Sequence, residues 1–129
     1  MEIKPSFLYG VRDGICGGVE FLGDSSLMYP AGAGIAKVST KDFSQEIIPL
    51  VNKGKRITAI GVNPTRKLIA FSEYGERPLL IIFDLETRKR RKILRCSELK
   101  SFEVVSIAFS HDSKYLLAQG GSPDFKLVY

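Results

Sequence analysis

The chain has 129 residues, of which 44% are hydrophobic and 26% charged, and it carries a formal net charge of +5. This composition is typical of a folded globular protein and excludes a collagen-like or low-complexity chain. No run approaches the roughly 18 apolar residues that a membrane span needs. Residues 1–10 lack the basic flank and apolar stretch of a secretory signal, which predicts a cytoplasmic or cytoskeletal protein.

One unit recurs three times along the chain. Residues 62–70 consist of an apolar strand end, a polar turn and the start of a second apolar strand. They match residues 21–29 at a distance of 41 positions and residues 109–117 at a distance of 47, without a gap inside the unit. Self-similarity at such a period is the mark of a repeat architecture.

The surroundings of the turn recur as well. We expect the first strand of each unit, before the turn, at 18–21, 57–62 and 104–109. The third strands are expected at 35–39, 79–83 and 126–129, and the fourth strands at 45–50 and 89–94. Gly and Pro residues interrupt every window that could form a helix, so no helix is expected. The run Leu79–Phe83 is apolar without alternation, which is typical of a strand with both faces buried.

A repeat of this length with four strands per unit predicts an all-β fold of WD40-type β-propeller blades, built from antiparallel four-stranded units. Residues 1–129 would form one partial propeller, with blade 1 at about 15–50, blade 2 at about 57–94 and a partial blade 3 at about 104–129. Propellers have about four to eight blades. We therefore expect an incomplete ring: a fragment, a truncated product or a piece that another chain completes.

Residues 105–118 resemble the strand–turn–strand unit of WD repeats, and Phe83-Asp84 stands where that family has its Trp-Asp pair. The chain has no Trp, and no Gly-His pair opens a blade. A narrower resemblance, to the start of the cilia- and flagella-associated WD-repeat protein 57 family (also called WD-repeat protein 65), rests on residues 29–32, 48–50, 57–59, 63–64, 71–73, 113–119 and 127–129.

This resemblance implies a non-catalytic protein-interaction scaffold of the ciliary or flagellar axoneme. It further implies a role in assembling or anchoring inner dynein arms. The expected partners are other axonemal proteins, namely inner dynein arm components and, as a further candidate, tubulin.

The run Arg88-Lys89-Arg90-Arg91-Lys92 is the candidate partner-binding patch. The favoured interpretation is a solvated turn and outer strand at the propeller rim, where charges also discourage edge pairing. The functional alternatives are contact with acidic tubulin tails, or a nucleic-acid-associated WD-repeat protein that uses this run. Nucleic acid is the less expected partner. A second basic cluster, residues 53–56, falls between two blades.

No catalytic or cofactor site is expected. Ser110, His111, Asp112 and Ser113 share one hairpin turn, whereas a catalytic triad gathers its groups around a held nucleophile. The lone His, with Cys16 and Cys96, cannot supply four zinc ligands. Both cysteines are expected to be free thiols. The sequence therefore predicts no enzyme activity, small-molecule substrate, cofactor, metal or membrane partner.

Overall fold

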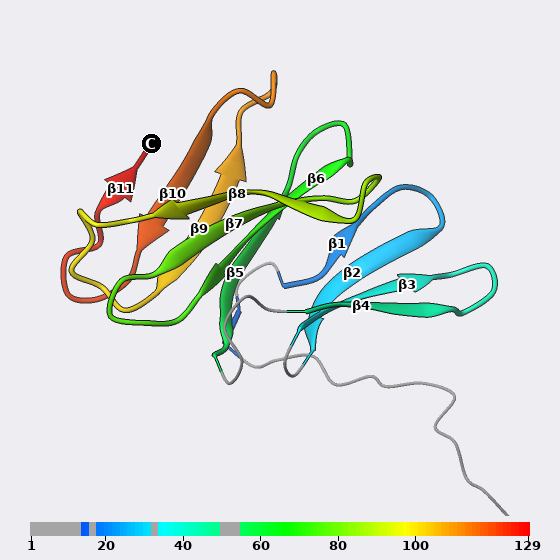
Figure 1. Ribbon diagram of the computed structural model, residues 1–129, viewed down its shortest axis with the longest axis horizontal. Helices are drawn as coiled ribbons and strands as arrows, with labels where there is room; N and C mark the ends of the chain where they lie inside the picture. Colours follow the sequence, from blue (N-terminus) through cyan, green and yellow to red (C-terminus); the bar gives the residue numbers. More distant parts are fainter. Residues whose placement is uncertain (1–13, 16–17, 32–33, 50–54) are drawn as a thin grey trace, which may run out of the picture.

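The computed structural model describes residues 14–15, 18–31, 34–49 and 55–129. Every regular element in this part of the chain is a β-strand (Figure 1), so the all-β prediction is confirmed. No helix in these residues has the length and apolarity that crossing a membrane requires.

The strands form three antiparallel sheets in chain order. The first contains β1 (Glu20–Phe21), β2 (Ser26–Ala31), β3 (Gly34–Ser39) and β4 (Gln45–Pro49). The second contains β5 (Ile57–Val62), β6 (Leu68–Glu73), β7 (Leu79–Asp84) and β8 (Lys89–Arg95). The third contains β9 (Val104–Phe109), β10 (Leu116–Gly120) and β11 (Leu127–Val128). Strands adjacent in sequence are adjacent in space, so each sheet is a meander.

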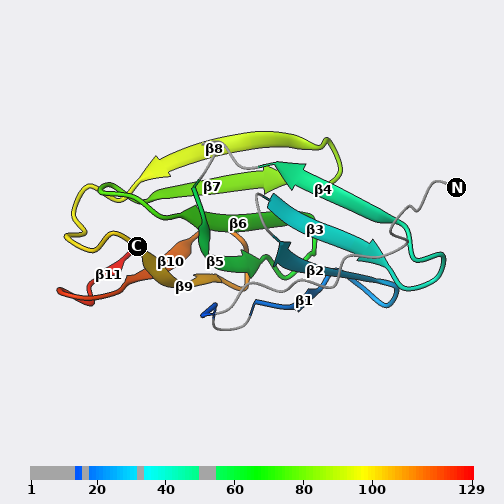
Figure 2. The same ribbon diagram turned by 90° about the horizontal axis from the view of Figure 1, so that it is seen from below.

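The second sheet lies between the other two and buries both of its faces (Figures 1 and 2). Its rear face, defined by Ile69, Phe71 and Ile81, packs on the first sheet. Its forward face, defined by Ala70 and Leu80, packs on the third. The partners are Met28, Ile35 and Ile48 in the first sheet and Val104, Ile107 and Ala118 in the third. Because successive strand residues point to opposite faces, the continuous apolar run of β7 serves both clusters.

The match at 47 positions holds in three dimensions. Val62 pairs with Ile69 across the first hairpin of the second sheet, and Phe109 pairs with Leu116 in the third. The tight turns correspond too: Arg66 N–H donates to Asn63 O at 2.9 Å, and Ser113 N–H donates to Ser110 O at 3.0 Å.

The match at 41 positions breaks inside the unit, and the gap-free prediction is wrong there. Phe21 pairs with Leu27, so the β1–β2 connection is one residue shorter than its counterpart in the second sheet. A one-residue slip moves every following side chain to the opposite face. Met28, fully buried against the second sheet, therefore corresponds to Ala70 rather than to Ile69.

Candidate functional site

The basic run lies along the outer strand of the second sheet. Arg88 closes the β7–β8 turn with a φ of 57°, and Lys89–Lys92 open β8. Among the strands of the described residues, β8 pairs only with β7 (Figure 2). All five side chains are exposed, whereas the neighbouring strand β7 is largely buried. Their positions agree with the expected outer strand.

The five cations do not share one surface. Arg90 pairs across the ladder with Phe83, which packs toward the first sheet, and Lys92 pairs with Ile82, which packs toward the third. Directly paired residues point to the same side of a sheet. The run is thus divided between the rear and the forward side of β8.

Arg91 is held by the second sheet itself. Its Nε donates to Asp84 Oδ2 at 2.9 Å. Asp84 Oδ1 accepts the backbone N–H groups of Glu86 and Thr87 at 2.9 and 3.1 Å. The Thr87 N–H above all, with help from the Arg91 charge, holds the pKa of Asp84 below its usual 3.8. Arg91 and Asp84 therefore organise the β7–β8 turn.

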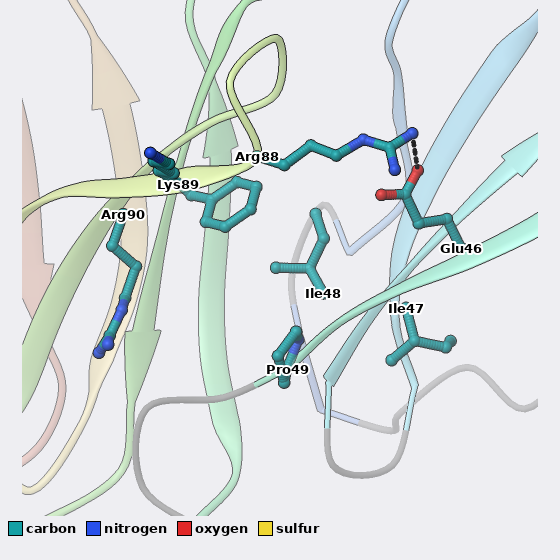
Figure 3. Close-up of a pocket in the computed structure, with 8 residues that line it drawn as sticks. Glu46, Ile47, Ile48, Pro49, Arg88, Lys89 and Arg90 are labelled. Carbon is teal, nitrogen blue, oxygen red and sulfur yellow. Dashed lines mark ion pairs between the residues drawn. The ribbon is translucent and has the colours of Figure 1, made fainter.

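A hollow of about 580 Å³ opens between β4 and the β7–β8 hairpin (Figure 3). Its apolar lining comes from Ile47, Ile48, Pro49 and Phe83, and its charged lining from Glu46, Arg88, Lys89 and Arg90. The Arg88 side chain crosses the gap between the sheets, and its Nη2 lies 3.4 Å from Glu46 Oε2. Both members of this ion pair remain accessible, at 70% and 39% exposure.

A second hollow of about 430 Å³ shares Glu46 and Arg88 with the first. It continues toward the start of β4, where its lining is polar and includes Lys37. Lys37 pairs with Glu46 across the β3–β4 ladder, so both side chains point toward the second sheet. We call the two hollows together the inter-sheet furrow; the Arg88–Glu46 ion pair divides it.

Other candidate groups from the sequence have local structural roles. In the turn of the third sheet, Ser110 Oγ donates to Asp112 Oδ1 at 2.6 Å, and Lys114 N–H donates to the same oxygen at 3.1 Å. These bonds lower the pKa of Asp112. The described residues contain no His, Cys, Asp and Glu group suited to a metal ion.

The remaining candidates are divided between described and undescribed parts of the chain. Arg56, from the second basic cluster, lies 4.2 Å from the centre of the Tyr74 ring and 3.8 Å from Glu103. Lys53 and Cys16 lie outside the described residues. Cys96 is a buried free thiol, and burial raises its pKa.

Sequence reasoning found Arg88, Lys89 and Arg90 of the furrow but missed Lys37, the apolar wall and the carboxylate. Glu46 and Ile48 belong to a different sheet from Arg88 and Arg90, and nothing in the local sequence around either strand reports on the other. The apolar run of β7 is the one available signal, because it indicates that another sheet covers Phe83.

No family model matches the chain. It is 31% identical over 125 residues, or 95% of its length, to cilia- and flagella-associated protein 57 of Mus musculus. It is 29% identical to cilia- and flagella-associated protein 57 C of Tetrahymena thermophila over 94% of its length, and to cilia- and flagella-associated protein 44 of Mus musculus over 99%. The chain spans 10%, 10% and 7% of these relatives.

Among solved structures, the C-terminal WD40 domain of Sif2 superposes with a TM-score of 0.62 at 12% identity. That match covers 78% of this chain and 29% of the other. A chain in the mitotic checkpoint complex structure gives a TM-score of 0.51 at 9% identity, covering 74% of this chain and 41% of that one. These similarities show the fold alone: the three sheets are WD40-type blades of a partial propeller.

Proposed function

We propose that the chain acts as a non-catalytic protein-interaction scaffold of the axoneme. The premise of this proposal is that the chain belongs to the family of cilia- and flagella-associated WD-repeat proteins. The relatives' names support a location in the cilium or flagellum. The similarity over 95% of the chain to cilia- and flagella-associated protein 57 carries the proposal.

The blade structure supports this proposal on physical grounds. Stacked sheets give a rigid body whose outer strands and turns are open to partners. We propose that residues 1–129 form one partial propeller region with blades at about 15–50, 57–94 and 104–129, and that exposed residues of Arg88–Lys92 contact acidic axonemal partners. Candidates are inner dynein arm components and tubulin, and the proposed role is in assembling or anchoring inner dynein arms.

The proposal is tested by expressing the tagged chain in ciliated cells and isolating axonemes. The chain should co-purify with axonemes and be released by salt, since exposed charge contacts weaken as ionic strength rises. Lys89→Glu with Lys92→Glu should release it at lower salt. Nuclear accumulation without axonemal signal would contradict the proposal and favour a nucleic-acid-associated role.

A further inference from the structure

We infer that the inter-sheet furrow binds an extended acidic protein segment that carries an apolar side chain, and that Glu46 occupies the place of a partner carboxylate until such a segment displaces it. This inference rests on the proposed scaffold function and names the partner class for one site of it. Its basis is the charge and lining of the furrow.

The charge of the furrow is unbalanced in favour of cations. Arg90, Arg88 and Lys37 follow one another along the two hollows, and Glu46 is the one acidic residue among the described residues that line them. Within the described part of the chain, no carboxylate forms an ion pair with Lys37 or Arg90. A ligand that supplies several carboxylates would therefore match this row.

The lining of the furrow favours a peptide over a nucleic acid. Next to the cations lie Ile48, which is buried, and Phe83, which is partly buried, and these form an apolar seat for a side chain. A phosphate backbone needs a continuous row of Lys and Arg contacts. The division of Arg88–Lys92 between two sides of β8 breaks up such a row.

The Arg88–Glu46 pair is suited to displacement. Exposed ion pairs of this kind contribute little to stability, because water and salt screen them. Since the pair is shared by both hollows, its opening would join them and free the Arg88 guanidinium for a carboxylate of the partner. Glu46 thus competes with the ligand from within the chain.

The test measures fluorescence anisotropy of labelled peptides on the full chain. The probe has glutamates flanking one phenylalanine; companion peptides replace the phenylalanine with serine or the glutamates with glutamine, and single-stranded DNA tests the other class of partner. We expect binding of the probe, weaker binding of the serine peptide, and none of the glutamine peptide.

Four variants assign that binding to the furrow. Glu46→Gln should tighten binding of the probe by up to about fivefold. The control Glu86→Gln removes the carboxylate of the exposed Lys67–Glu86 pair at 3.0 Å and should leave binding of the probe unchanged. Arg90→Glu should weaken it by about tenfold, and Lys92→Glu, on the other side of β8, should weaken it much less.

Arg88→Gly separates binding from folding. Arg88 has a left-handed φ of 57°, which glycine adopts without strain, so the variant loses the cation while the turn keeps its stability. It should bind the probe less tightly with an unchanged or raised melting temperature.

The inference is wrong if Glu46→Gln behaves like Glu86→Gln, if Arg90→Glu behaves like Lys92→Glu, or if DNA binds more tightly than the probe with the same variant effects. Failure of the proposed function looks different. In that case the tagged chain is missing from axonemes while the furrow variants still change peptide binding in the expected order.

Discussion

The forward faces of the second and third sheets are built from equivalent positions but have different surroundings. Ala70 and Leu80 are 0% and 3% exposed under the third sheet, whereas their equivalents Leu117 and Leu127 are 42% and 65% exposed. On the same open face Tyr115 and Tyr129 stack with ring centres 5.5 Å apart. Apolar strand residues in the same repeat positions are therefore core in one blade and surface in the next.

This difference shows where the stability of the described residues resides. A side chain that two sheets enclose loses all of its contact with water, and its removal leaves a cavity that neighbours cannot fill. A side chain on an open sheet face keeps its water contact, and its removal leaves no cavity. Equal sequence patterns should thus give unequal effects on the free energy of unfolding.

Leucine truncation on the two faces gives the largest expected difference. Leu80→Ala should lower the free energy of unfolding by about 2–5 kcal/mol, because the side chain is enclosed between sheets. Leu127→Ala should change it by less than about 0.5 kcal/mol. Urea unfolding of both variants checks this. Equal losses would mean that another molecule covers the third sheet's forward face in solution.

The same comparison explains how much could be predicted from the sequence. The 47-residue match and the two-sided burial of β7 could be predicted, because Gly and Pro punctuation and an uninterrupted apolar run fix them. The side of the first sheet on which each residue of β2 lies could not be predicted. Leu27 and Met28 are both apolar, so the hydrophobic pattern does not choose between two registers, and the shorter β1–β2 turn decides.

The candidate site was predictable only in part for a related reason. A run of cations on an outer strand is visible in sequence, and the structure places it there. The side on which each cation lies depends on the β-bulge between Ile82 and Phe83 in the β7–β8 ladder, because without it Arg90 and Lys92 would share one side. The furrow depends on how the first sheet stacks against β7. The bulge belongs to the local pairing of two consecutive strands, whereas the stacking joins elements far apart in the chain.

The second-largest expected difference is between the polar turns of the second and third sheets. Asn63 is 2% exposed, and its Oδ1 accepts the Lys67 and Leu68 N–H groups at 3.0 and 2.8 Å. Ser110, in the equivalent position, accepts one backbone N–H, from Tyr115, at an exposed site. Asn63→Ala should cost about 2–3 kcal/mol and Ser110→Ala about 1 kcal/mol in unfolding free energy.

Asn63→Asp is the matched control for the second-sheet turn. The carboxylate keeps an acceptor for both backbone groups but loses the amide N–H donors to Thr65 Oγ1 at 2.7 Å and to Ser113 Oγ at 3.2 Å. Its cost in urea unfolding should therefore be smaller than that of Asn63→Ala. A larger cost for Ser110→Ala than for Asn63→Ala would contradict the ranking of the two turns.

Acid should weaken the third-sheet turn more than the second-sheet turn. The Ser110 hydroxyl, followed by the Lys114 N–H, lowers the pKa of Asp112 below 3.8. The Asp112 carboxylate therefore contributes its stability above pH 3.8, and this contribution is lost as the pH falls through the folded-state pKa. The urea midpoint of Asp112→Ala should lie below that of the unchanged chain near neutral pH and approach it in acid. The penalty of Asn63→Ala should not shrink in this way, because no carboxylate organises that turn.

The smallest expected effect concerns the connection between β10 and β11. Phe125 has a left-handed φ of 47° and a side chain that is 61% exposed, whereas its equivalent in the second sheet, Pro78, is buried. Phe125→Gly should raise the free energy of unfolding by a few tenths to about 1 kcal/mol, because relief of the backbone strain exceeds the extra entropy of an unfolded glycine. Phe125→Ala is the control, since it removes the ring but keeps the strain, and it should show no gain in thermal unfolding. A loss of stability in both variants would show that the phenylalanine ring itself stabilises the open edge of the third sheet.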